Sequence, residues 1–184
     1  MSTMKIFKYP EINRIPIPGF RIRGKHYLLP EEVEELLKGE VVVEEKLDGN
    51  TMAEEQEGYM IFGEYLKWAH SIHYTALPDW FVGFDVWDGE KFLPRREKEV
   101  VFDILGIPCV PLLFRGRIRS VDQLISFLGR PSAFGAPRIE GIVVKNYSTG
   151  KMGKIVDPRF EDQIDSSPHW RRKKRILNIL KPTS

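Results

Sequence analysis

The chain has 184 residues, enough for one domain with a substantial core and too few for two domains of ordinary size. Hydrophobic residues make up 42% and charged residues 29%, the balance of a soluble globular protein, and the single cysteine, Cys109, excludes an internal disulfide framework or a cysteine metal cluster. Without a long apolar run or a signal-peptide pattern, the sequence predicts a cytoplasmic protein with no membrane partner.

The first elements in chain order are an extended segment, a short helix and a strand. Residues 1–30 are expected to be extended, because prolines interrupt them. Pro30 begins a predicted helix with acidic residues in its first turn and Gly39 just past its end. The run EVVVEEK, Glu40–Lys46, then predicts a strand that stops at the turn signal Asp48-Gly49.

The rest of the chain mixes strands and helices without regular alternation, which predicts an α+β fold with antiparallel sheets. Ser120 and Gln123 form a capping-box pattern, and Gly106 ends the helix before it. The predicted strands are residues 59–64, 80–87, a run through Cys109, 141–145 and 154–157; the predicted helices are residues 94–105, a helix ending at Gly129, and a basic C-terminal helix within 168–184, over 168–180.

Charge is unevenly distributed along the chain. Residues 31–57 contain eleven acidic residues and two lysines, whereas the chain from Lys145 onward contains ten Lys or Arg and four Asp or Glu. The run Arg171–Arg175 is either a solvated helix face or a contact for nucleic acid.

Lys46 stands at the end of a hydrophobic strand, against a tight turn, which is an unusual place for a strongly hydrated ammonium group. One interpretation is an ordinary ion pair with Glu45 or Asp48. The other is a nucleophile, because partial burial and nearby cations favour the neutral amine that can attack phosphorus.

Five short motifs follow one another along the chain, and together they cover the region from Glu45 to Phe160. They are EKLDG at 45–49, IFGEY at 61–65, FVGFDVWD at 81–88, EGIVVK at 140–145 and GKIV at 153–156. In this order they resemble the covalent nucleotidyltransferases, which comprise DNA ligases, RNA ligases and mRNA-capping enzymes. The tract from Gly63 to Asp88 is most similar to the RNA ligase branch.

The resemblance implies one adenylyltransferase domain over residues 1–184, an ATP-grasp-like fold with two antiparallel sheets flanked by helices and no OB-fold domain. It implies that Lys46 takes AMP from ATP and passes it to the 5′-phosphate end of a polynucleotide, an RNA with a 3′-hydroxyl partner strand being the expected substrate. The implied cofactors are ATP and Mg²⁺ or Mn²⁺.

The resemblance also implies roles for single residues. Lys46, Lys145 and Lys154 would be catalytic, with Lys154 holding the α-phosphate and Lys145 helping it. Glu140 would bind the metal, Glu64 would contact the ribose, and Phe84 would stack on the purine unless it is simply part of the core. The implied nucleotide-binding set is Glu45, Lys46, Asp48, Gly49, Glu64, Phe84, Glu140, Lys145 and Lys154.

The sequence departs from the family pattern between the first motifs. Lys46 and Glu64 are 18 residues apart, where relatives carry several tens of residues and an arginine, and this chain has no arginine between Arg23 and Arg95. Two alternatives therefore stay open. One is nucleotidyl transfer without ligation, as in capping, and the other is a degenerate module that only binds nucleotide or RNA.

Overall fold

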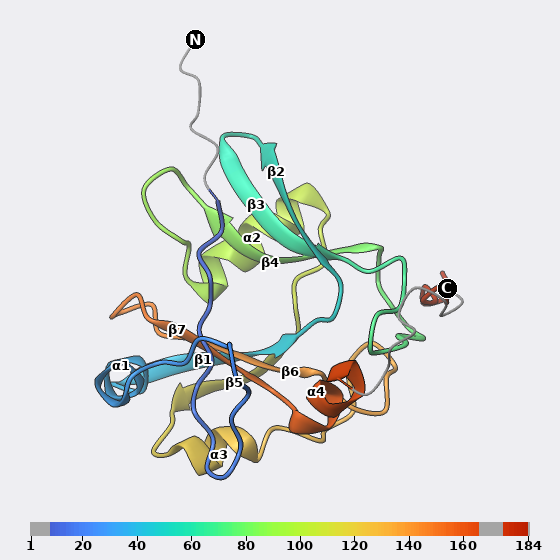
Figure 1. Ribbon diagram of the computed structural model, residues 1–184. Coiled ribbons are helices and arrows are strands. Elements are labelled where there is room, and N and C mark those ends of the chain that lie inside the picture. Colours follow the sequence, from blue (N-terminus) through green and yellow to red (C-terminus); the bar gives the residue numbers. More distant parts are fainter. Residues whose placement is uncertain (1–7, 166–174, 184) are drawn as a thin grey trace.

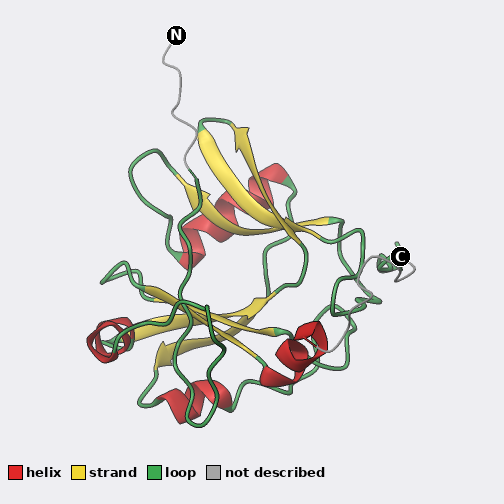
Figure 2. Ribbon diagram, in the orientation of Figure 1, coloured by secondary structure: helices red, strands yellow, loops and turns green. Residues whose placement is uncertain are grey.

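The computed structural model describes residues 8–165 and 175–183, and they form two antiparallel sheets that face each other (Figures 1 and 2). The four-stranded sheet has the order β5 (Leu112–Arg117), β1 (Glu40–Lys46), β6 (Gly141–Lys145), β7 (Met152–Val156). The three-stranded sheet has the order β2 (Asn50–Gln56), β3 (Tyr59–Tyr65), β4 (Phe81–Trp87). The helices are α1 (Pro30–Leu36), α2 (Arg95–Leu105), α3 (Val121–Ile125) and α4 (Pro158–Asp165). The predicted α+β class with two antiparallel sheets is confirmed.

The four-stranded sheet buries one face against α1 and α3. Side chains alternate along a strand, so Val41 and Val43 of β1 pack with Leu36 of α1 and Leu124 of α3. The neighbouring strand β6 places Ile142 and Val144 in the same core. The opposite face of β1 and β6, which carries most of their charged side chains, is therefore turned toward the three-stranded sheet.

The three-stranded sheet is covered by α2. Ile61 of β3 and Val86 of β4 pack against Val101 and Phe102 of that helix. The N-terminal residues then connect the two sheets on one side, drawn in blue in Figure 1. Tyr9 contacts the ring of Phe62 in β3, and Arg14 bridges to Lys154 in β7.

Several elements differ from the predictions. The strands β2 and β5 and the helix α4 were not predicted; β2, with the sequence NTMAEEQ, is mostly exposed and lacks apolar alternation, so its pairing with β3 defines it. The predicted run through Cys109 is a single bridge to Gly83. Among the described residues, no helix is long and apolar enough to cross a membrane.

The predicted C-terminal helix is corrected where the structure describes it. Residues 166–174, which include Arg171–Lys174, lie outside the described residues. Residues 175–183 are not helical. They run along the loop between β3 and β4, with bridges from Leu177 to Trp68 and from Leu180 to Leu77, because this tertiary pairing satisfies backbone groups that a helix would have satisfied locally.

Candidate active site

A cavity of about 320 Å³ lies between the two sheets. Strands of both sheets line it, and the N-terminal residues 9–12 close one side. The lining residues are Tyr9, Pro10, Glu11, Ile12, Glu44, Glu45, Lys46, Leu47, Thr51, Glu64, Phe84, Val110, Val143, Lys145 and Lys154. This volume falls in the range of small-molecule sites, about 300–1,000 Å³.

Lys46 is the last residue of β1, and its amine opens into this cavity. The Lys46 Nζ donates a hydrogen bond to Glu140 Oε2 at 2.6 Å, and the two side chains are 23% and 12% exposed. Glu140 comes just before β6, where Gly141 pairs with Lys46. A side chain at Gly141 would collide with the Ile155 carbonyl oxygen, so glycine lets β6 approach β7 closely at this point. Burial raises the pKa of Glu140, and Lys46 offsets part of that rise.

Lys154 of β7 lines the same end of the cavity. Burial lowers the pKa of Lys154, and the positive charges of Lys46 and Arg14 lower it further. Arg14 is itself ion-paired with Glu161 of α4. No carboxylate of the described residues lies within ion-pair distance of Lys154, so its ammonium is available to an anionic ligand such as a polyphosphate.

Glu64 of β3 lines the cavity, and one of its carboxylate oxygens accepts no hydrogen bond from the described residues. The Thr51 hydroxyl donates to Glu64 Oε1 at 3.0 Å, whereas no described residue donates to the buried Glu64 Oε2. Burial raises the pKa of Glu64 to about 7. A Cβ at Gly49 would lie 3.3 Å from Glu64 Oε2 and 2.6 Å from the Tyr65 carbonyl oxygen, so glycine allows the chain after Lys46 to pass close to β3 and to this carboxylate. A buried carboxylate oxygen without a partner is a place where a ligand hydroxyl would bind.

A β-bulge in β4 directs both Phe84 and Asp85 into the space between the sheets. Phe62 of β3 pairs with Asp85 and Gly63 pairs with Gly83, so Phe84 is skipped in the register. Phe84 lines the cavity, and its ring lies edge-on to that of Tyr9 with centroids 5.0 Å apart. Phe84 is thus a cavity wall and also belongs to the apolar cluster beside it.

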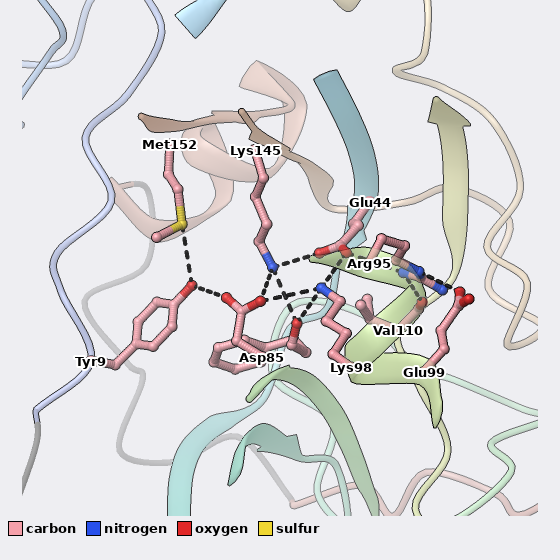
Figure 3. A network of polar contacts seen from close by, with 10 residues as sticks. Tyr9, Glu44, Asp85, Arg95, Lys98, Glu99, Val110, Lys145 and Met152 are labelled. Carbon is pink, nitrogen blue, oxygen red and sulfur yellow. Dashed lines mark hydrogen bonds and ion pairs between the residues drawn. The ribbon is translucent and has the colours of Figure 1, made fainter. Parts of the chain in front are cut away.

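Beside Phe84, a buried ionic network joins the two sheets (Figure 3). The Lys145 ammonium contacts Glu44 Oε2 at 2.6 Å and Asp85 Oδ1 at 2.9 Å. Lys98 of α2 contacts Glu44 Oε1 at 2.5 Å and Asp85 Oδ1 at 3.2 Å, and Arg95 contacts the same Glu44 oxygen at 3.1 Å. Each carboxylate is thus shared by at least two cations.

The network fixes the charge of its members. Burial alone would raise the pKa of Glu44, but Lys145, Lys98 and Arg95 outweigh it and hold the pKa at about 2. Burial likewise disfavours the charged form of Lys98, and the carboxylates of Glu44 and Asp85 reverse this effect and raise its pKa. Glu44 and Lys98 therefore stay ionised at neutral pH.

The predicted site residues therefore fall into three groups. Lys46, Glu64, Glu140 and Lys154 lie together at one end of the cavity, with Phe84 as a wall. Lys145 also lines the cavity, but its ammonium is paired with Glu44 and Asp85, and it lies 5.7 Å from the centroid of the Phe84 ring.

The remaining three predicted site residues belong to the first motif, and each contacts other parts of the protein. The Glu45 carboxylate accepts hydrogen bonds from the Ser132 hydroxyl and the Ala133 N–H, although the residue also borders the cavity. Asp48 accepts from the N–H groups of Ser71 and Ile72. Gly49 provides the close approach to β3 described above.

Sequence reasoning missed the residues of the ionic network other than Lys145. Glu44 carries a readable signal, because it lies two residues before Lys46 and so shares its face of β1. Tyr9, Arg95 and Lys98 carry none, because only the tertiary structure brings them to β1 and β4. His73, in the loop between β3 and β4, donates a hydrogen bond from Nε2 to the Leu177 carbonyl at 2.9 Å. No cluster of three or more His, Cys, Asp or Glu suited to a metal occurs within 8–165 and 175–183.

Comparison with known proteins gives a family. The sequence profile of the family described as RNA ligase matches residues 50–156, more than half of the chain. The chain belongs to the RNA ligase family. Among curated proteins, no sequence matches it.

Solved structures of a Naegleria gruberi RNA ligase resemble this RNA ligase family member in fold. A variant with ATP and Mn is 15% identical with a TM-score of 0.57 over 87% of this chain and 64% of that chain. An apo variant is 18% identical with a TM-score of 0.55 over 73% and 54%, and the form with PPi is 15% identical with a TM-score of 0.55 over 74% and 55%.

The chain thus spans little more than half the length of these ligase chains. At identities of 15–18%, the similarity to these structures concerns the fold alone. That fold is the nucleotidyltransferase fold of the RNA ligases, a branch of the covalent nucleotidyltransferases.

Proposed function

We propose that this protein is an ATP-dependent, RNA ligase-like enzyme that forms lysyl–AMP on Lys46 and transfers the AMP to a 5′-phosphate polynucleotide end. The observation that carries the proposal is that the Lys46 amine opens into a cavity that also contains an aromatic wall, Phe84, and a second lysine, Lys154. Family membership and the ATP and Mn in the Naegleria structures support the choice of nucleotide and of a divalent cation.

The cavity suggests how ATP would lie. The purine would stack on Phe84, whose ring forms the wall at the network end of the cavity. A ribose hydroxyl would donate to the buried Glu64 Oε2, to which no described residue donates a hydrogen bond. The phosphates would then lie between Lys46 and Lys154.

In the first step, the Lys46 Nζ attacks the α-phosphorus of ATP. A nitrogen–phosphorus bond forms, the bond between the α-phosphorus and the bridging oxygen breaks, and pyrophosphate leaves. Lys46 must lose a proton for this attack, and Glu140, which accepts a hydrogen bond from Nζ, is placed to take it. Lys154 would stabilise the negative charge that grows on the phosphate oxygens.

Glu140 is also the residue that would hold a divalent cation. Its carboxylate is partly exposed and offers an oxygen ligand, which a hard cation such as Mg²⁺ prefers, and Mg²⁺ needs only one or two protein carboxylates. When bound, the cation would add positive charge at the phosphate oxygens.

In the later steps, the AMP would pass from Lys46 to the 5′-phosphate of an RNA end, and a 3′-hydroxyl would displace it as the strands join. The basic run at 171–175 is the proposed contact for that RNA. Arg171–Lys174 lie outside the described residues; the Arg175 guanidinium lies 5.8 Å from the centroid of the Trp68 ring.

The test is incubation of the purified protein with ATP and Mg²⁺ or Mn²⁺, followed by intact-mass measurement and peptide mapping. The expected result is one AMP per chain on Lys46. Addition of 5′-phosphorylated RNA should remove the label and give adenylylated and joined RNA.

Each alternative has its own outcome in this test. ATP binding without an adduct contradicts the proposal and favours the binding module. An adduct that forms equally from GTP, or that never passes to RNA, favours nucleotidyl transfer to another acceptor.

A further inference from the structure

The C-terminal segment, residues 175–181, lies along the loop of residues 66–77 that joins β3 to β4. The two stretches of backbone exchange hydrogen bonds of 2.8–3.0 Å over the whole length of the contact. From the loop, the N–H groups of Ala69 and Leu77 donate to the carbonyls of Ile176 and Ile179. From the C-terminal segment, the N–H groups of Asn178, Ile179 and Lys181 donate to the carbonyls of Lys67, Tyr74 and Leu77, in that order. The end of the chain therefore acts as a backbone partner for a loop that has no place in either sheet.

Asn178 fixes this contact at both ends of the loop. Its side-chain Oδ1 accepts from the Tyr74 N–H at 2.8 Å, and its Nδ2 donates to the Leu66 carbonyl at 2.7 Å. Asn178 is 2% exposed, so water cannot easily replace these bonds when the side chain is removed.

The same loop holds the chain directly after Lys46. The N–H groups of Ser71 and Ile72 donate to Asp48 Oδ2 at 2.6 and 3.0 Å. The Asp48 N–H in turn donates to the hydroxyl of Tyr74, a fully buried residue, at 3.0 Å.

These bonds matter because β1 ends at Lys46. The ladder between β1 and β6 stops at the pair of Lys46 and Gly141, so the residues that follow Lys46 are held by the loop instead. A continuous path of contacts thus runs from Asn178 through Tyr74 to Asp48 and so to the nucleophile.

We propose that Asn178 is a positioning residue, which acts through Tyr74 and Asp48 to hold the Lys46 amine where it can attack the nucleotide. This inference rests on the proposed function, because it assigns a role in lysyl–AMP formation. Small displacements of a reacting group are costly even when their cause lies away from the chemistry, on the order of a hundredfold in rate for 1 Å.

The test compares Asn178→Ala, Tyr74→Phe and the double variant in single-turnover formation of lysyl–AMP at saturating ATP. Tyr74→Phe keeps the buried ring and removes only the hydroxyl that accepts from Asp48. Each single change should lower the rate by about tenfold or more while the ATP concentration for half-maximal rate changes little. The control is Ile176→Ala, whose exposed side chain lies on the same segment, and it should react at the wild-type rate.

The double variant separates positioning from general weakening of the fold. If the two residues act along one path, the double variant should be no slower than the slower single variant. Effects that multiply, or a Tyr74→Phe variant that reacts at the wild-type rate, would overturn the proposed path.

Amide hydrogen exchange without nucleotide tests the anchoring independently of catalysis. Asn178→Ala should speed exchange at Asp48, Ser71 and Ile72, whereas Ile176→Ala should not. Unchanged exchange at Asp48 would contradict the role of Asn178. A wild-type protein that never forms lysyl–AMP would contradict the proposed function, and the two failures are thereby distinguished.

Discussion

The two ends of the cavity use the same face of β1 in opposite ways. Glu44 and Lys46 are two residues apart and point into the same space, yet Glu44 is fully buried among three cations, whereas Lys46 is 23% exposed and has one ion pair. Figure 3 shows the crowded end, where every charged side chain drawn has a partner.

This difference in pairing indicates that the Glu44 end of the cavity is structural, whereas the Lys46 end is suited to chemistry. At the Glu44 end, the pairs join β1 and β6 to β4 and α2, so they hold the sheets at a fixed distance. At the Lys46 end, the pKa of Lys154 is lowered, the pKa of Glu64 is raised, and one oxygen of Glu64 has no described donor. An anionic ligand with hydroxyl groups would satisfy these groups.

The largest expected effect is the loss of chemistry at Lys46. Lys46→Ala should abolish covalent AMP labelling, because it removes the proposed nucleophile, and should leave the protein folded, because it removes a single ion pair at the end of β1. Labelling by mass spectrometry and thermal melting measure the two effects. The bond in the wild-type protein should survive alkali and break in acid, as a phosphoramidate does. Full labelling of the alanine variant would remove the central proposal.

The largest stability effect is expected at the other end of β1. Glu44→Gln should destabilise the fold by about 3 kcal/mol or more, because it leaves three buried cations with less compensating charge. Glu45→Gln is the matched control. That neighbour is equally buried but is bonded to Ser132 and Ala133 rather than to a cation, so its loss should cost about 1 kcal/mol or less. Equal losses in urea unfolding would show that the network contributes no more than an ordinary buried hydrogen bond.

Removal of charge beside the phosphates should slow lysyl–AMP formation without comparable loss of ATP binding. Glu140→Ala and Lys154→Ala should each lower the rate at saturating ATP by on the order of a hundredfold. Lys154 opposes the negative charge that grows on the phosphate oxygens, and Glu140 accepts the Lys46 proton and would hold the divalent cation. Lys151→Ala, just before β7, changes a lysine that lies near Glu32 and Glu35 and should leave the rate unchanged. A wild-type rate for Glu140→Ala or Lys154→Ala would refute the role assigned to that residue.

The smallest expected effect is a pH dependence from Glu64. Its pKa is raised to about 7, so below about pH 4.5 it is protonated in both the folded and the unfolded protein. As the pH rises toward 7 the unfolded chain releases this proton first, and the fold loses stability. Glu64→Gln should therefore stabilise the protein above pH 7 by roughly 1 to 3 kcal/mol and change little at pH 4.

Urea unfolding at pH 4 and pH 8 measures this difference. Glu55→Gln, on the exposed strand β2, is the control, and it should show the same small change at both pH values. A Glu64→Gln variant without extra stability at pH 8 would mean that ionised Glu64 is not destabilising in the folded protein.

The sequence by itself determined the local elements and the motifs. The strand Glu40–Lys46 and the strand Gly141–Lys145 could be placed to the residue, because dense β-branched runs end at glycine-containing turns. The fold class followed from the irregular mixture of strands and helices, the family resemblance followed from the order of the motifs, and both are confirmed. Lys46, Glu64 and Lys154 line one cavity and Glu140 contacts Lys46, and the roles that the motifs implied for these residues stay predictions.

Only the tertiary structure decided which groups neutralise one another and what holds the nucleophile. Lys46 meets Glu140 across 94 positions, and Tyr74 meets Asn178 across 104. Residues 175–180 were predicted to be helical, but their backbone groups form hydrogen bonds with the loop of residues 66–77 instead of with one another. Lys145, expected at the phosphates, is instead paired with Glu44 and Asp85. These ion pairs and hydrogen bonds join residues that are far apart in the sequence, so local sequence patterns cannot predict them.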